Sequence, residues 1–311
     1  MEHPSQGNGR ATAIAYLQVL LAGILWATSG PFSIALHRLG LPPTSVALLR
    51  PATGGLLLGL ILLFWHGRRI RPTPGALLWM LLGGGVIVGV FQLAYQMSTA
   101  AVGVPATVAL LYLAPALVIL GSRVIFGEPI TPVKGTLAIV SVVGVWLTVM
   151  GAEGLDVELT PAGILWGCLC GISYASYTIF GKGFGARHGA LAPLFWSTLG
   201  GSVLLGAVWL LSGEPVILPD DALTWATLLL FGFLTIGGAP LLLFHAMRTI
   251  QAGRAAIGTT IEPLVATLLA VALLDQVLTP GGWLGMGLLL VGVTGAYATR
   301  TRRPEDDRSR P

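Results

Sequence analysis

Two stretches of this chain, 112–132 (YLAPALVILGSRVIFGEPITP) and 260–280 (TIEPLVATLLAVALLDQVLTP), align without a gap. Each has a proline at its fourth position and ends in Thr-Pro, and the offset is 148 residues throughout. A constant offset over distant segments indicates an internal duplication. The alignment extends to Gly144-Val145 with Gly292-Val293, and the same offset pairs Trp26-Ala27-Thr28 with Tyr174-Ala175-Ser176.

The composition places this duplicated unit in a membrane. The chain has 311 residues, of which 54% are hydrophobic and 10% are charged, and its mean hydropathy is +0.83. Soluble domains carry about 25% charged residues, so this chain has too little charge to cover a soluble surface. That excludes a cytosolic enzyme, a nucleic-acid-binding protein and a disordered chain, and it favours a polytopic membrane protein.

The chain divides into ten apolar runs separated by short charged or Pro/Gly turns. Each run holds about 20 residues or more, enough to cross the hydrocarbon core as a helix. We therefore predict an all-α membrane protein of ten transmembrane helices. The runs are about 13–36, 43–65, 75–97, 104–126, 132–151, 161–183, 190–211, 222–246, 255–274 and 280–299.

These ten helices divide into two repeats of five. We expect a tail at 1–12, a first repeat at 13–151, a second repeat at 161–299 and a basic tail at 300–311. Because five is odd, the second repeat must enter the membrane in the opposite sense to the first. Inverted repeats are typical of transporters, in which two related halves exchange conformations around a central site.

Basic residues predict the orientation of the helices. All but two of the 17 Lys and Arg residues fall in the tails or in alternate turns, on one side of the predicted membrane. By the positive-inside rule, both termini are then cytoplasmic. The exceptions are Arg38, in an outer turn, and Arg50, inside a predicted span. The inner set comprises Arg10, Arg68, Arg69, Arg71, Arg123, Lys134, Lys182, Arg187, Arg248, Arg254, Arg300, Arg302, Arg303, Arg308 and Arg310.

Taken together, these residues resemble the drug/metabolite transporter superfamily, specifically the ten-helix EamA type. The turn Gly127-Glu128-Pro129-Ile130-Thr131-Pro132 carries the resemblance, with Ala114-Pro115, Glu262-Pro263 and Trp26. The second copy of the turn, Asp275-Gln276-Val277-Leu278-Thr279-Pro280, lacks Gly-Glu, which suggests a structural role only. The resemblance extends to bacterial exporters of amino acids, including aromatic ones. It lies in the predicted helices 75–97, 104–126, 222–246 and 255–274. The resemblance implies a secondary exporter or exchanger of amino acids and related metabolites in the bacterial inner membrane.

Two charged residues fall inside predicted spans, Arg50 and Glu262. A charge at the centre of a membrane helix costs about 2.5–3.5 kcal/mol on insertion scales, so each needs an explanation. Either they bind substrate or gate its path, or each is a structural tie to backbone carbonyls or hydroxyls. Their predicted depths differ by roughly 10 Å at the helical rise, so we expect no direct ion pair.

Polar and aromatic residues gather at matching depths in several spans, and we predict that they line a substrate cavity. The alternatives are hydrogen bonds between helices, aromatic anchoring at the membrane surface, or, for His245, a simple helix-end position. We expect three tryptophans near span ends to anchor the helices at the membrane surface: Trp65, Trp79 and Trp225. The predicted cavity residues are Trp26, Ser29, Gln92, Tyr95, Gln96, Tyr112, Tyr174, Tyr177, His245, Thr260 and Glu262.

Prolines and glycines inside the spans predict local geometry. Pro31, Pro115 and Pro263 each remove a helix hydrogen bond, and we read them as hinges or, alternatively, as static kinks. We expect close helix packing at Gly83-Gly84-Gly85, at Gly200-Gly201 and at Gly285-Met286-Gly287.

Other functions find less support. An intramembrane enzyme would need clustered His, Asp or Glu, and the chain has no His-Glu-x-x-His motif; a channel would show a filter motif. A carrier of nucleotide sugars or drugs is the nearer alternative. We predict no catalytic residue, cofactor or metal, no disulfide at Cys168 and Cys170, no nucleic acid, and a monomer that contacts lipid and a small substrate.

Overall fold

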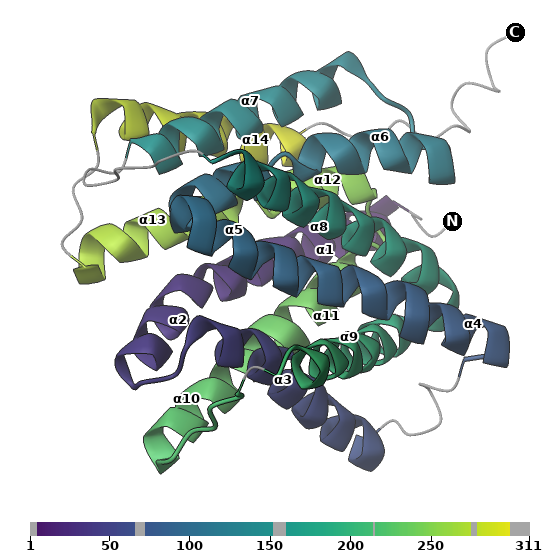
Figure 1. The fold of residues 1–311 in the computed structure, drawn as a ribbon. Helices are drawn as coiled ribbons and strands as arrows, with labels where there is room; N and C mark the ends of the chain where they lie inside the picture. Colours follow the sequence, from purple (N-terminus) through teal and green to yellow (C-terminus); the bar gives the residue numbers. More distant parts are fainter. Residues whose placement is uncertain (1–4, 66–71, 152–159, 214, 275–278, 299–311) are drawn as a thin grey trace, which may run out of the picture.

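The computed structural model describes residues 5–65, 72–151, 160–213, 215–274 and 279–298, and the secondary structure of these residues is helical (Figure 1). The first half contains α1 (Ser5–Ala27), α2 (Ser29–Arg38), α3 (Pro43–Trp65), α4 (Pro74–Leu78), the π-helix η1 (Trp79–Gly84), α5 (Gly85–Leu111), α6 (Ala114–Phe126) and α7 (Pro132–Met150). The second half contains α8 (Pro161–His188), α9 (Leu191–Ser212), α10 (Ala222–Gly232), the π-helix η2 (Phe233–Gly238), α11 (Ala239–Ala246), α12 (Ala252–Gly258), α13 (Ile261–Leu274) and α14 (Pro280–Ala298).

Helix length and hydropathy identify a multi-pass membrane protein. Within the described residues, two shorter apolar helices, Pro132–Thr148 and Pro280–Gly295, accompany seven segments that are long and apolar enough to cross a bilayer. The predicted count of ten spans and the side on which the termini lie stay predictions. The seven segments are Arg10–Ser33, Thr44–Leu63, Pro74–Tyr95, Ala106–Phe126, Pro161–His188, Leu191–Ser212 and Ala222–Ala246.

The outer surface of the helices is apolar. Large hydrophobic side chains stand fully outward, among them Val124 at 83% exposure and Leu211 at 87%. A surface of this kind is stable against lipid tails and would aggregate in water. The fold therefore has an apolar exterior, and its polar groups are concentrated inside and at the helix ends.

The helix α5 contains a reversal of the chain. It runs from Gly85 to Leu111, yet the Thr107 hydroxyl donates to the Ser98 hydroxyl at 2.8 Å. Nine residues of straight helix would separate these two positions by about 13 Å. The chain thus turns back between them, and α5 supplies parts of two predicted spans, 75–97 and 104–126.

Each predicted hinge proline follows an interruption of its helix. The α1–α2 break falls at Thr28, three residues before Pro31, and the α5–α6 break lies directly before Ala114-Pro115. The α12–α13 break, at Thr259-Thr260, precedes Pro263 in the same way. A proline removes one N–H and its ring clashes with the carbonyl four residues earlier, which explains the position of each break. Whether these breaks move during transport stays a prediction.

Glycines allow helices of the two halves to pack closely, and in one case the two helices are repeat equivalents. The helices α7 and α14 lie side by side in Figure 1, and a Cβ added to Gly144 would lie 2.9 Å from the Gly285 carbonyl oxygen. In the same way, a Cβ on Gly85 would lie 2.9 Å from the Gly200 Cα. Gly287 has open space beside it, so its predicted packing role falls to Gly285 alone.

Candidate substrate-binding cavity

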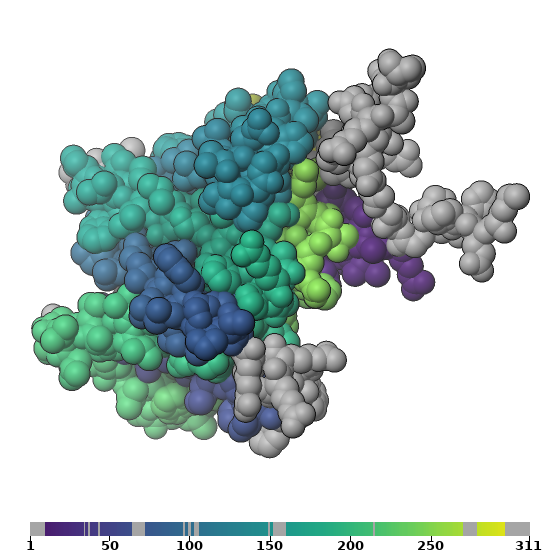
Figure 2. Space-filling model, turned by 90° about the vertical axis from the view of Figure 1, so that its right-hand side faces the viewer, coloured from purple at the N-terminus to yellow at the C-terminus, as the bar shows by residue number. Residues whose placement is uncertain are grey.

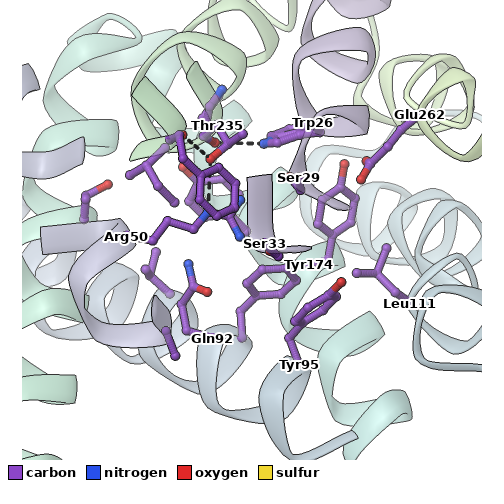
Figure 3. Close-up of a pocket in the computed structure, with 18 of the residues that line it drawn as sticks. Trp26, Ser29, Ser33, Arg50, Gln92, Tyr95, Leu111, Tyr174, Thr235 and Glu262 are labelled. Carbon is purple, nitrogen blue, oxygen red and sulfur yellow. Dashed lines mark hydrogen bonds between the residues drawn. The ribbon is translucent and has the colours of Figure 1, made fainter. Parts of the chain in front are cut away.

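A cavity of about 110 Å³ lies between the two halves of the protein (Figure 3). Its lining comes from α1, α2, α3, α5, α8, α9, α10, η2, α11 and α13. Side chains separated by nearly 150 residues therefore meet around one space. Of the residues predicted from the sequence, the cavity brings together Trp26, Ser29, Arg50, Gln92, Tyr95, Tyr112, Tyr174, Tyr177 and Glu262.

Three predicted residues have other positions. Thr260 is fully buried at the α12–α13 break and donates its hydroxyl to the Ile257 carbonyl at 2.6 Å, and the same carbonyl also accepts the Thr260 backbone N–H at 3.1 Å. His245 is exposed and lines a separate hollow with His188 and Arg248. The side chain of Gln96 lies outside the described residues.

Arg50 projects into the cavity from α3, directly before Pro51. Its Nε donates to Thr235 Oγ1 at 3.0 Å, and its guanidinium carbon lies 4.4 Å from the centre of the Phe231 ring. The remaining guanidinium N–H groups donate to no described residue. These two contacts hold the Nε edge and one face of the guanidinium group. The two terminal nitrogens, which we call the outer fork, are directed at the cavity (Figure 3).

Glu262 lies in the first turn of α13, where the helix dipole favours a negative charge. Its Oε2 accepts a hydrogen bond from the Tyr112 hydroxyl at 2.6 Å. Tyr112 is 1% exposed and occupies the α5–α6 break, so the bond joins the interrupted helices of the two halves. As predicted, Arg50 and Glu262 form no ion pair, and Figure 3 shows them on opposite sides of the cavity.

Aromatic rings fill the space between these two charges. Trp26 and Tyr174, which are equivalent residues of the two repeats, contact each other edge to face with ring centres 5.8 Å apart. Phe91 lies 6.2 Å from Tyr174 and 6.3 Å from Tyr95, measured between ring centres. The indole N–H of Trp26 donates to the Thr235 carbonyl at 2.9 Å. A ligand here would meet aromatic faces between a cation and a carboxylate.

Several lining residues are not among those predicted from the sequence, including Ser33, Phe91 and Thr235. Two of them carried a usable signal, because Ser33 lies four residues after Ser29 and Phe91 lies four before Tyr95, on the same helix faces. Thr235 carried none. It belongs to the π-helix η2, and only the fold brings it to Arg50 and Trp26.

A second group of buried charges lies where the α6–α7 turn meets α8 and α12, and we call it the Glu128 cluster. Figure 2 views the molecule from the right-hand side of Figure 1, the side on which the α6–α7 turn lies. Glu128 Oε1 accepts from Lys182 Nζ at 3.0 Å and from the Ala252 backbone N–H at 3.3 Å. Lys182 also donates to the Ile250 carbonyl at 3.0 Å. These contacts tie the α6–α7 turn of the first half to α8 and α12 of the second. The cluster comprises Glu128, Lys134, Lys182 and Arg254.

The Glu128 cluster corrects the expectation that Arg50 and Glu262 are the two buried charges. Glu128, Lys134 and Arg254 are 8%, 6% and 6% exposed. From the sequence alone, all three are expected at turns on the inner side of the membrane. Arg254 in fact lies inside α12 and donates to the Tyr16 hydroxyl at 2.9 Å.

The chemistry available in the cavity is that of binding. Within the described residues, no group of three His, Cys, Asp or Glu side chains is placed to hold a metal ion, and both cysteines are free. The cavity offers one cation, one carboxylate, hydroxyl and amide groups, and aromatic rings. Such a set recognises a small molecule that carries charge and apolar surface.

Comparisons with known proteins agree with this picture. A solved crystal structure superposes with a TM-score of 0.76 over 91% of this chain and 96% of its own, at 20% identity, which supports the fold. An uncharacterized transporter of Bacillus subtilis (strain 168), YwfM, is 26% identical over 156 residues. That alignment covers 50% of this chain and 51% of the relative, so the chain spans about half the length of the curated relative it matches.

The model of the EamA-like transporter family matches the chain twice, at residues 13–150 and 161–298. Each match covers one half of the sequence, on either side of the segment between α7 and α8. Members of this family are transporters and not enzymes. The chain belongs to the EamA-like transporter family, within the drug/metabolite transporter superfamily.

Proposed function

We propose that this transporter carries amino acids and related small metabolites across the bacterial inner membrane, as a secondary exporter or exchanger. The observation that carries the proposal is the presence of Arg50 and Glu262 on opposite sides of one aromatic cavity. An amino acid has a carboxylate, an ammonium group and a side chain, and the cavity offers a complementary group for each. Each charge is costly to place in a membrane span, and the contacts of each with described residues use only part of its hydrogen-bonding groups.

Alternating access between the two halves is the mechanism we propose. The cavity is lined from both repeats, and equivalent residues such as Trp26 and Tyr174 meet inside it. Interrupted helices stand at equivalent places, before Pro115 and Pro263. Two halves of related structure and opposite topology have two arrangements around one site, each open to a different side.

Carriage of a phosphorylated metabolite, such as a nucleotide sugar, is the second candidate. Phosphate recognition uses clusters of Lys and Arg. Arg50 is the one Lys or Arg among the described residues that line the cavity, and Glu262 would repel a phosphate. The composition of the cavity therefore favours an amino acid.

The proposal is tested with purified protein in liposomes preloaded with an unlabelled amino acid mixture. We expect uptake of at least one labelled amino acid well above that of protein-free liposomes. A parallel panel contains nucleotide sugars, sugar phosphates and cationic drugs. Uptake confined to that second panel would refute the assignment of amino acids while leaving a carrier in place.

A further inference from the structure

We infer that the cavity binds its substrate as a dipolar ion in one fixed orientation, with the carboxylate on Arg50 and the ammonium group on Glu262. This inference rests on the proposed function and adds to it the atoms that each pole contacts. It also assigns the space between the poles to an aromatic or large apolar side chain.

The cation is prepared for a carboxylate. Thr235 and Phe231 fix the Nε edge and one face of the Arg50 guanidinium. The N–H groups of its outer fork face the cavity and donate to no described residue. A buried cation without a partner is unfavourable, whereas a guanidinium fork matches the two oxygens of a carboxylate. The free fork therefore points to an anionic group of the ligand.

Gln92 adds a second unsatisfied group to this pole. It is 2% exposed, it lines the same cavity, and its amide forms no hydrogen bond with a described residue. Buried amides in folded proteins are nearly always hydrogen-bonded. A substrate carboxylate that already occupies Arg50 would satisfy this amide as well.

Only one of the two carboxylate oxygens of Glu262 accepts a hydrogen bond from a described residue. Oε2 accepts from Tyr112, whereas Oε1 accepts from no described residue. An ammonium group donates in three directions and accepts none, so it suits the free oxygen of Glu262. The same ammonium group would compete with Tyr112, because both donate to one carboxylate. Substrate binding would thereby weaken the shorter of the two hydrogen bonds by which Tyr112, at the α5–α6 break, contacts the α12–α13 region; the other runs from its hydroxyl to the Thr259 carbonyl at 3.5 Å.

The walls between the poles suit a ring. Trp26, Phe91, Tyr95 and Tyr174 form a connected set of ring contacts with centres 5.8 to 6.3 Å apart. Aromatic pairs prefer offset or edge-to-face contacts over this distance range. A phenyl side chain would join the set without displacing a polar group.

The test uses three probes and two variants. L-phenylalanine carries both poles, 3-phenylpropanoate lacks the amine, and 2-phenylethylamine lacks the carboxylate. Binding to purified wild type, Arg50→Gln and Glu262→Gln is measured by the quenching of tryptophan fluorescence and by calorimetry. Trp79→Ala is the matched control, since that ring is 69% exposed on η1.

Each variant should bind more weakly the probes that carry the group recognised by the substituted residue. Arg50→Gln should weaken phenylalanine and 3-phenylpropanoate about ten- to a hundredfold, the value of one charge-assisted hydrogen bond, and leave 2-phenylethylamine within threefold. Glu262→Gln should weaken phenylalanine and 2-phenylethylamine and spare 3-phenylpropanoate. The spared probe shows in each case that the variant is folded.

Two results would overturn the inference. The first is an equal loss of all three probes in either variant, with folding verified by gel filtration. The second is the reverse pattern, in which Arg50→Gln spares the carboxylate probe. If wild type transports amino acids in liposomes and one of these results holds, the orientation fails while the proposed function stands. If no amino acid binds or moves, the proposed function itself fails.

Discussion

At the scale of single residues, the cavity holds one cation and one carboxylate on opposite sides, with aromatic rings between them. Arg50 and Glu262 stand out because almost every other charge lies at a span end. Gln92 and Tyr95 followed from the cost of polar groups against lipid. Thr235 and Phe231, which hold Arg50, could not be predicted, since their positions depend on how η2 and α10 pack against α3.

The first prediction concerns transport by residue variants. Glu262→Gln and Tyr95→Ala should lower amino-acid exchange in liposomes at least tenfold, because one removes the negative pole and the other opens the aromatic wall. Trp79→Ala should retain most of the wild-type rate at equal protein content. Equal losses in all three variants would show that the cavity is not on the substrate path.

At the scale of elements, the apolar runs predicted whole helices well where the chain is regular. The run 43–65 is α3 (Pro43–Trp65), and 280–299 is α14 (Pro280–Ala298) within one residue. Hydropathy did not show the π-helices η1 and η2, whereas the predicted runs 75–97 and 104–126 left a turn where α5 reverses. A π-helix changes the hydrogen-bond pattern without changing composition, so no apolar pattern marks it.

The second prediction concerns the interrupted helices. Pro263→Ala restores an N–H that pairs with the Thr259 carbonyl in a regular helix. We expect an unchanged or higher melting temperature together with slower exchange, since a continuous helix resists bending. The matched control is Pro132→Ala at the first position of α7, where proline is well tolerated. Unimpaired exchange by the Pro263 variant would make the break a static kink.

The third prediction concerns the start of α10. Asp221 caps this helix, its Oδ1 accepting from the backbone N–H of Leu223 at 2.8 Å and of Thr224 at 2.9 Å. The Thr224 hydroxyl also donates to Asp221, and hydrogen bonds from Thr224 lower the pKa of this exposed carboxyl below its usual 3.8.

A carboxyl whose pKa is lowered by folding stabilises the folded state above its unfolded pKa, and this contribution is lost as pH falls through the folded pKa. Asp221→Ala should therefore lower the melting temperature at neutral pH, by a margin that shrinks below about pH 4. Asp221→Asn keeps the cap without the titration, so it should remain close to wild type at neutral pH. Thermal melts in detergent across pH check both, and a margin for Asp221→Ala that does not change with pH would contradict the assignment.

At the scale of the whole molecule, the duplication is the strongest result of the sequence. The 148-residue offset predicted two related halves, and the structure places equivalent parts of them in contact, α7 with α14 and Trp26 with Tyr174. The Glu128 cluster could not be foreseen, because its carboxylate bonds to groups more than 50 residues away. Which membrane face holds this cluster is predicted by the basic residues alone.

The fourth prediction tests the cluster as a tie between the halves. Lys182→Met removes the donor to Glu128 and to the Ile250 carbonyl. Hydrogen exchange of backbone amides over residues 247–256 should then rise at least tenfold. Arg187→Met, an exposed position in the last turn of the same helix, should leave exchange unchanged. If the amides of residues 247–256 exchange equally slowly in both variants, the contacts of Lys182 do not hold the two halves together.

The Glu128 cluster also makes the two ends of this transporter unequal. At the offset of 148, Glu128, Lys134, Lys182 and Arg254 correspond to Gln276, Gly282, Ile34 and Ala106, none of which is charged. In the alternating access that we propose, one arrangement of the halves holds an ion pair that its mirror arrangement lacks, so we expect the two to be unequally populated. Apparent affinity falls with the fraction of molecules open to a given side. KM should therefore be lower for substrate offered on the side of the membrane away from the cluster.

For a carrier without a driving ion, a closed thermodynamic cycle nevertheless requires the ratio of maximal rate to KM to be equal in both directions. A measured inequality in that ratio would reveal a coupled ion, and equality would mean that the cluster sets the pace of exchange and leaves the final gradient untouched.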